Sequence, residues 1–433
     1  MSEWTHCQLS DVCEFFIGGT PSRNQPEFWA TPPNGSPWLA ISDLKSKFLL
    51  GSKEHITELG ALSSNVKLIP SDSTVMSFKL SIGRTGITKK PMYCNEAIAF
   101  FKPHEGELSS RWLYHSIPTA ANRVVTDSAV KGATLNKKKI AEIPLHLPPL
   151  NEQVGVANVL DTLDIQIQKT EALIAKLEKV KEGLLHDLLT HGIDERGLLR
   201  PSPEQAPELY KESPLGLVPR EWECGSLGEL STSSVIGPFG SDLVASDYRP
   251  EGVPVVFVRD VVSKTFTWKS EVYVDHLKAA SLSAHDVIAG DVLLTKMGLP
   301  PCIACTYPSE FSEGIVTADI VRLRPDKSMV LPDWISNYAN SEHVASQVRA
   351  ITSGVTRPKV TLSDVRSLKV AVPPLKDQRA ILLRVSEASR RVNAARTSLS
   401  KLLSEKSGLM DDLLTGRVRV TPLLEQAQAS TPA

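Results

Sequence analysis

The chain has 433 residues, enough for two to four domains, and its 41% hydrophobic and 22% charged residues are typical of a globular protein and not of a disordered one. Its formal net charge is −1, which excludes a non-specific polyanion binder, so any contact with nucleic acid has to come from local basic loops. No window supplies the roughly 18–20 apolar residues of a membrane span, and the first residues lack the pattern of a signal peptide, so we expect a cytoplasmic protein.

Cysteine usage and catalytic motifs exclude further classes. The six cysteines are too sparse for a disulfide scaffold, and the pair Cys302 and Cys305 lacks the second ligand pair that a structural zinc needs. Residues 83–86 lack the Lys-Ser/Thr of a phosphate-binding loop, and neither a G-x-S-x-G elbow nor an H-E-x-x-H motif occurs. We therefore expect no catalytic residue and no metal site in this chain.

The sequence contains an internal duplication. Residues 147–153 (LPPLNEQ) recur at 372–378 (VPPLKDQ), and residues 181–190 match 406–415 at the same offset along the chain. Two matches in one phase are hard to obtain by chance, and so long a period indicates duplication of a whole domain instead of a solenoid.

The duplication also sets the domain boundaries. Upstream, 4–12 parallels 222–230 and 35–44 parallels 252–261, at an offset slightly smaller than that of the first two matches. We predict the following segments: a globular unit at 1–150, a long helix at 151–200, a linker at 201–221, a second globular unit at 222–375, a second long helix at 376–420 and a disordered tail at 421–433.

Both globular units mix short apolar strands with helices and loops. In the second unit, 253–258 and 291–295 are rich in β-branched residues and predict strands. Helices are predicted to begin near Arg111 in the first unit and near Asp333 in the second. The predicted fold class is therefore α+β (α/β), duplicated.

Each copy ends in a stretch without proline whose apolar residues alternate at spacings of three and four. This pattern has a period of 3.5 and describes a seam between two helices. The predicted seam residues are Leu160, Leu163, Ile167, Ile174, Leu177, Leu184 and Leu188 in the first copy, and Val385, Val392, Leu399, Leu402, Leu409 and Leu413 in the second. A lysine interrupts both series at equivalent places, Lys181 and Lys406.

About 40 residues at 1.5 Å each make a rod of roughly 60 Å, and the simplest partner for one rod is the other. We predict an antiparallel coiled coil that separates the two globular units with approximate two-fold symmetry. The alternative is that each helix packs only on its own globular unit, although such a helix usually has a wider apolar face.

Basic residues gather in loops of both units and could reach phosphates or guanine edges. The candidate DNA-binding residues are Lys79, Arg84, Lys89, Lys90, Lys131 and Lys137 in the first unit, and Arg259, Lys296, Arg357 and Lys359 in the second.

The order of these segments resembles the specificity subunit of type I restriction-modification systems, over essentially the whole chain. Residues 18–22 (GGTPS) and 237–241 (GPFGS) look like the openings of that family's target recognition domains. The motifs at the helix entries match the family's conserved regions for partner docking at Pro148, Pro149, Leu150, Glu152, Gln153, Pro373, Pro374, Leu375 and Gln378. One departure is Asp377, where the family has glutamate.

The resemblance implies a non-catalytic subunit. Each target recognition domain would read one half of a bipartite asymmetric site in double-stranded DNA, and the helices would act as a ruler for the spacer. Two modification (methyltransferase) subunits, which carry S-adenosylmethionine, would dock on the conserved regions, and restriction/translocase subunits would bring ATP and magnesium.

Two other interpretations remain. A self-contained DNA adenine methyltransferase, or a methylase-nuclease fusion, needs an Asn/Asp-Pro-Pro-aromatic motif, which none of the Pro-Pro sites at 32–33, 148–149, 300–301 and 373–374 supplies. A coiled-coil scaffold with two protein-binding heads explains the rods but not the duplicated basic loops.

Overall fold

The computed structural model describes residues 4–126, 135–352 and 358–422. The chain divides into two compact units: unit 1 contains Met1–Ala172 and Arg396–Ala433, and unit 2 contains Leu173–Ala395. Each unit therefore combines one α+β head with the first part of one long helix and the last part of the other.

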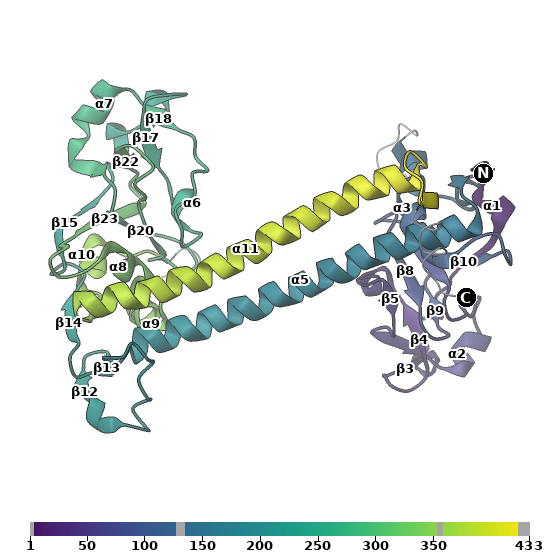
Figure 1. Ribbon diagram of the computed structural model, residues 1–433, viewed down its shortest axis with the longest axis horizontal. Coiled ribbons are helices and arrows are strands. Elements are labelled where there is room, and N and C mark those ends of the chain that lie inside the picture. Colours follow the sequence, from purple (N-terminus) through teal and green to yellow (C-terminus); the bar gives the residue numbers. More distant parts are fainter. Residues whose placement is uncertain (1–3, 127–134, 353–357, 423–433) are drawn as a thin grey trace. The chain divides into compact units, whose positions relative to one another are not determined.

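Two small sheets form the head of unit 1. The larger sheet has the order β2 (Cys13–Ile17), β10 (Ile98–Pro103), β7 (Thr74–Ser77), β8 (Thr85–Thr88) and β5 (Phe48–Leu49). The smaller has the order β3 (Trp29–Ala30), β6 (Glu54–Ile56), β4 (Ser36–Leu39) and β9 (Tyr93–Cys94), and β1 (Thr5–Gln8) pairs with β11 (Pro144–Leu147). The helices of this head are α1 (Leu9–Val12), α2 (Glu58–Leu62), α3 (Ser110–Thr126) and α4 (Lys137–Ala141) (Figure 1).

The head of unit 2 repeats the order of four strands in each sheet, and its fifth strand extends the sheet that has four strands in unit 1. One sheet has the order β15 (Ser231–Ile236), β23 (Ile320–Pro325), β20 (Val292–Thr295) and β21 (Ala304–Thr306). The other has the order β16 (Tyr248–Arg249), β18 (Tyr273–Val274), β17 (Val253–Val256), β22 (Gly314–Val316) and β19 (Asp286–Val287). The pair β14 (Glu223–Ser226) with β24 (Lys369–Val372) corresponds to β1 with β11, and β12 (Tyr210–Ser213) pairs with β13 (Gly216–Pro219). The helices are α6 (Val258–Val261), α7 (His276–Ser281), α8 (Pro332–Ala339), α9 (Glu342–Ile351) and α10 (Leu362–Ser367).

The two long helices are α5 (Leu150–Thr190) and α11 (Leu375–Leu414), labelled in Figure 1. In unit 1 they run antiparallel, because Glu152 near the start of α5 pairs with Arg419 just beyond α11, whereas Asp164 pairs with Lys406 at 2.6 Å. In unit 2 the end of α5 shares a core with the beginning of α11 through Leu188 and Ile381.

The predicted seam follows this packing closely. Every predicted seam position in α5 and α11 is buried or half-buried, and none is exposed. A period of 3.5 keeps such a row on one side of a helix over its whole length, so the burial follows from the sequence spacing. The interrupting Lys406 is accommodated because Asp164 neutralises it.

The long helices end earlier than the sequence pattern suggested. The predicted helix spans 151–200 and 376–420 extend too far, since α5 ends at Thr190 and α11 at Leu414. Gly192 and Gly416 follow these ends with φ of +69° and +74°. A glycine in the left-handed conformation two residues after the last helical residue is a common helix stop. A Cβ added to Gly192 would lie 2.5 Å from Trp222, and one added to Gly416 would lie 3.0 Å from Trp4. The absence of a side chain at each glycine therefore leaves room for a tryptophan ring.

Two further segment predictions need correction. The strand predicted at 253–258 ends at Val256, and α6 begins at Val258. The predicted linker 201–221 contains the hairpin β12–β13. Of the predicted tail 421–433, residues 423–433 lie outside the described residues.

Candidate nucleic-acid interface

The candidate interface is built on one hairpin in each unit. Hairpin loop 1 (residues 78–84) joins β7 to β8, and hairpin loop 2 (residues 296–303) joins β20 to β21. The strand orders make β7 equivalent to β20 and β8 equivalent to β21, so the two loops occupy the same place in the fold.

The same hydrogen bonds close both loops. In loop 1, the amide of Gly83 donates to the carbonyl of Ser77 at 2.9 Å, and the amide of Arg84 donates to the Ser77 hydroxyl at 3.2 Å. In loop 2, the amide of Cys302 donates to the carbonyl of Thr295 at 2.7 Å, and the amide of Ile303 donates to the Thr295 hydroxyl at 3.1 Å. Ser77 and Thr295 are thus equivalent residues that hold the loops in shape.

Two neighbouring segments brace each loop. The Phe78 amide donates to the carbonyl of Ala97 at 3.0 Å, and the Leu135 amide donates to the carbonyl of Phe78 at 3.2 Å. In unit 2 the Lys296 amide donates to the carbonyl of Asp319 at 2.8 Å, and the Val360 amide donates to the carbonyl of Lys296 at 3.0 Å.

The structure separates the candidate DNA-binding residues of unit 1 into two groups. Lys79 and Arg84 lie in hairpin loop 1, and the exposed Lys137 follows the brace at Leu135. Lys89 and Lys90 lie beyond the opposite end of β8, where Lys89 pairs with Asp72 at 2.6 Å. Lys131 lies outside the described residues.

In unit 2 the candidates converge on hairpin loop 2. The backbone of Lys359 forms an isolated antiparallel β-bridge with Met297 of the loop. The Lys296 ammonium lies 4.8 Å from the ring centroid of Phe239. Arg259 lies over the ring of Phe257 and lines a neighbouring cavity that Asp319 also lines. Arg357 lies outside the described residues.

Sequence reasoning missed three exposed apolar residues at this surface. Phe239 in the GPFGS turn is 54% exposed, Leu80 in hairpin loop 1 is 93% exposed and Leu299 in hairpin loop 2 is 80% exposed. Scanning for basic residues could not find them, although the opening of the second recognition domain already contained Phe239.

The predicted docking residues at the helix entries have mixed surroundings. Leu150 is exposed, whereas the side chains of Gln153 and Gln378 are fully buried within their own units. Gln153 accepts from the amide of Ser109 at 2.7 Å and donates to the carbonyls of Glu107 and Pro148 at 2.8 and 2.9 Å.

Gln378 repeats this arrangement in unit 2. It accepts from the Leu331 amide at 2.8 Å and donates to the carbonyls of Met329 and Pro373 at 3.2 and 2.8 Å. Both glutamines therefore fasten the first turn of a long helix to the loop that precedes the main head helix. This role explains why glutamine recurs in both motifs.

Glu152 is also buried, and its contacts are specific to unit 1. It accepts hydrogen bonds from Arg419 Nε at 2.7 Å and from Trp4 Nε1 at 3.2 Å, and the Arg419 hydrogen bond lowers the pKa of its carboxyl group. Glu152 therefore connects the start of α5 to the segment that follows α11.

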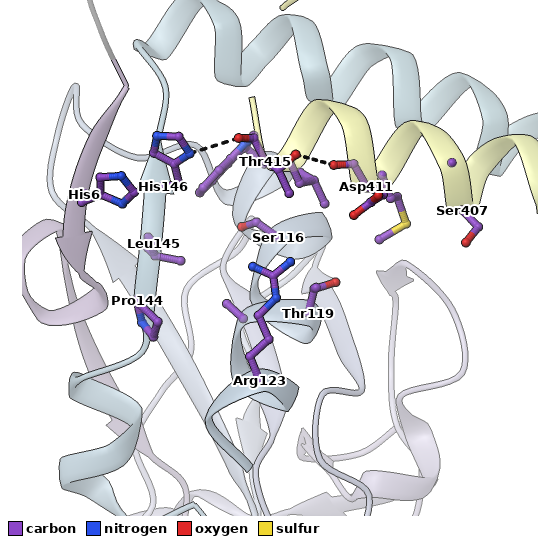
Figure 2. Close-up of a pocket in the computed structure, with 15 residues that line it drawn as sticks. His6, Ser116, Thr119, Arg123, Pro144, Leu145, His146, Ser407, Asp411 and Thr415 are labelled. Atoms are coloured by element: carbon purple, nitrogen blue, oxygen red, sulfur yellow. Dashed lines mark hydrogen bonds between the residues drawn. The ribbon is translucent and has the colours of Figure 1, made fainter. Parts of the chain in front are cut away.

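A groove in unit 1 lies between α3, β11 and the end of α11 (Figure 2). Its volume is 690 Å³, and the side chain of Arg123 points into it along α3. His146 crosses one end, where its Nδ1 lies 3.1 Å from the carbonyl of Thr415 and its ring stacks on His6.

Unit 2 has an equivalent groove of 490 Å³ beside the end of α5. Glu182, Leu185 and His186 line it at the positions that correspond, through the internal duplication, to Ser407, Met410 and Asp411. Each unit therefore presents one groove where a long helix ends against its head.

A buried charged cluster in unit 1 could suggest a metal site, but its chemistry does not fit one. The ligand atoms of His115, Asp161 and Asp164 lie within 4.8 Å of one another. Asp161, however, already pairs with Lys47 and with Arg111, and His115 Nε2 lies 2.6 Å from its carboxylate. These cationic partners occupy the carboxylate and would repel a metal ion.

In chemical terms, each unit offers a rigid, basic hairpin loop on an α+β head, while its long-helix segments are held by buried amide contacts. These features define the class of protein: a duplicated α+β protein in which each copy carries a basic hairpin loop and ends in a long helix. Within the described residues, no helix is long and apolar enough to cross a membrane.

Comparison with known proteins finds similarity to one family. Residues 1–179 match the type I restriction modification DNA specificity domain. The chain is 22% identical to the putative type I restriction enzyme MjaX specificity subunit of Methanocaldococcus jannaschii, over 96% of this chain and 94% of that protein. It is 30% identical to the EcoR124I/EcoR124II specificity subunit of Escherichia coli over 41% of this chain and 44% of that protein.

Solved structures share the fold over nearly the whole length. A chain from a study of complex assembly and conformational transition of the type I R-M system superimposes with a TM-score of 0.61, 17% identity and coverage of 96% of this chain and 98% of that one. The type I restriction-modification S subunit of M. genitalium gives a TM-score of 0.56 at 14% identity, with coverage of 95% and 96%. Over nearly its whole length, the chain is similar to specificity subunits of type I restriction enzymes and shares the fold of solved S subunits.

Proposed function

We propose that this chain is the DNA sequence-specificity subunit of a type I restriction-modification complex and that it catalyses nothing itself. Each unit would read one half of a bipartite asymmetric site in double-stranded DNA. The observation that carries this proposal is the pair of hairpin loops, which share their backbone hydrogen bonds but differ in side chains. One scaffold with two different sets of contacting groups suits two different half-sites.

The two grooves support docking of two modification subunits, one on each unit. Both grooves lie where a long helix ends against a head, and they correspond through the internal duplication. S-adenosylmethionine would be bound by these partners, and ATP and magnesium by the restriction/translocase subunits. This chain would supply only the contacts that place them on DNA.

We also propose that α5 and α11 set the spacer between the half-sites. A helix of 41 residues is about 60 Å long, compared with about 34 Å for one turn of DNA. Inserting one heptad into both helices at equivalent seam positions should lengthen the preferred spacer and leave both half-sites unchanged. A changed half-site would contradict the ruler.

The decisive experiment is methyl transfer to DNA with and without the modification subunit. The purified chain alone should transfer no methyl group, and the mixture should methylate adenines at a split target that is mapped by sequencing a genome carrying the system. Methylation by the chain alone would overturn the non-catalytic assignment. Methylation of a continuous, unsplit site would overturn the two-reader assignment.

A further inference from the structure

We propose that Leu80 and Leu299 are apolar wedges that insert between base pairs, one in each half of the DNA site. This inference rests on the proposed function and assigns a specific action to each hairpin loop. Both leucines lie in equivalent loops and are 93% and 80% exposed. Leaving a leucine in water forgoes the stabilisation that its burial would provide, so its presence at the same place in two diverged units indicates a role outside the free chain.

The loops present the leucines on fixed backbones. The closing hydrogen bonds that Ser77 and Thr295 accept, and the hydrogen bonds that Leu135 and Val360 donate to the loops, are equivalent in the two units. Leu80 also has φ of +61°, a conformation that is strained for leucine and that persists only where the surroundings impose it. A loop backbone that is already fixed loses little conformational entropy when its leucine inserts.

The charges around the leucines favour nucleic acid as the partner. Lys79 and Arg84 flank Leu80, and hairpin loop 2 begins with Lys296 and bridges to Lys359. Lysine and arginine can hold the phosphates on both sides of a base step while an apolar side chain enters it, and leucine is a known kind of wedge. A modification subunit is the competing partner, because Pro300 and Pro301, next to Leu299, line the groove of unit 2.

The test uses the assembled complex and duplexes that carry the mapped site, with 2-aminopurine placed at each adenine in turn. The fluorescence of 2-aminopurine rises when the base loses its stacking partners. Wild-type complex should raise the signal at one step in each half-site. Leu80→Ala should abolish the rise in one half-site, Leu299→Ala should abolish it in the other, and each should weaken binding by roughly tenfold.

Matched controls separate the possible outcomes. Leu62→Ala and Leu277→Ala remove leucines that are 79% and 86% exposed elsewhere in the same units, and they should behave as wild type. Equal signals from Leu80→Ala and Leu62→Ala would overturn the wedge. Loss of assembly with the modification subunit in Leu80→Ala or Leu299→Ala would also overturn it and assign the leucine to the protein contact. Failure of the wild-type complex to bind the mapped duplex would instead count against the proposed function.

Discussion

The two units share the order of four strands in each sheet but bury charge in different places. In unit 1 the carboxylate of Asp161 on α5 is buried and binds Lys47 and Arg111 from the head. The residue of α11 that corresponds to it through the duplication is Ser386 in unit 2, which is exposed and bonds only within its own helix, to the carbonyl of Leu383 at 2.8 Å. Unit 1 thus adds a charged connection between its head and a long helix.

Unit 2 instead buries charge inside its head. Arg322 on β23 is 2% exposed and donates to Asp286 at 3.1 Å, and Arg324 donates to Asp291 at 2.9 Å. In unit 1 the residue equivalent to Arg322 is Phe100, which stacks on Phe16 with ring centroids 5.1 Å apart. An ion-pair network and an aromatic stack thus support the same sheet, which shows that topology tolerates either solution when every buried polar group is paired.

The largest effects on this comparison should come from removing Asp161 and Asp291, the carboxylates that bind the cationic groups described above. Asp161→Ala should destabilise unit 1 by about 3–5 kcal/mol, because it leaves the buried Lys47 without the carboxylate it pairs with. Asp291→Ala should destabilise unit 2 by less, because Asp286 still pairs with both Arg322 and Arg324. Hydrogen exchange should locate the loss in the mutated unit. The control Ser386→Ala should change the free energy of unfolding by less than about 0.5 kcal/mol. Equal losses in both units from one change would contradict two separate networks.

The glutamine contacts should be the feature in which the units agree. Gln153→Leu and Gln378→Leu should each cost about 3 kcal/mol, because a leucine leaves one backbone amide and two carbonyls without their hydrogen bonds. Denaturant unfolding of the two variants measures both values. A large cost in only one unit would show that the duplicated motif has lost its role in the other.

Gly192 and Gly416, the glycines that follow the long helices, should differ in how much their substitution lowers the free energy of unfolding. Gly192→Ala should cost about 2–3 kcal/mol and Gly416→Ala less, because both have positive φ but Trp222 is fully buried, whereas Trp4 is half-buried and can shift. Gly183→Ala and Gly408→Ala are matched controls inside the helices, where an added Cβ meets nothing within 4 Å. They should stabilise the chain by about 0.5–1 kcal/mol in thermal unfolding.

The pH dependence of unit 1 should depend on His115. Burial, together with the positive charges of Lys47, Lys406 and Arg111, lowers its pKa to about 3. In the unfolded chain, His115 binds a proton below about pH 6.5, whereas in the folded chain it stays neutral until about pH 3. The free energy of unfolding therefore falls as the pH drops from about 6.5 towards 3, by about 2 kcal/mol at pH 5. His115→Gln should flatten this slope in unfolding measurements. The pKa of His343 in unit 2 is also lowered by burial and should account for part of the remaining slope.

Much of the fold could be predicted from the sequence because its signals are periodic or repeated. The seam positions, the constant offset between the two helix copies and the helix starts near Arg111 and Asp333 all follow from local spacing. The candidate interface was predicted less well. Lys79, Arg84 and Lys296 lie in the two hairpin loops, but Lys89 lies at the far end of its strand, and the exposed leucines carry no distinctive local pattern.

The sequence by itself determined the duplication, the α+β heads and the buried row of each long helix, because helix period and repeat phase are properties of residue order alone. Only the tertiary structure decided that Gln153 and Gln378 face inward, that Asp161 binds a lysine 114 positions away, and that both hairpin loops close through a hydroxyl residue. Hydrogen bonds and ion pairs join groups that are distant along the chain, and their partners are fixed only when packing brings specific atoms within reach.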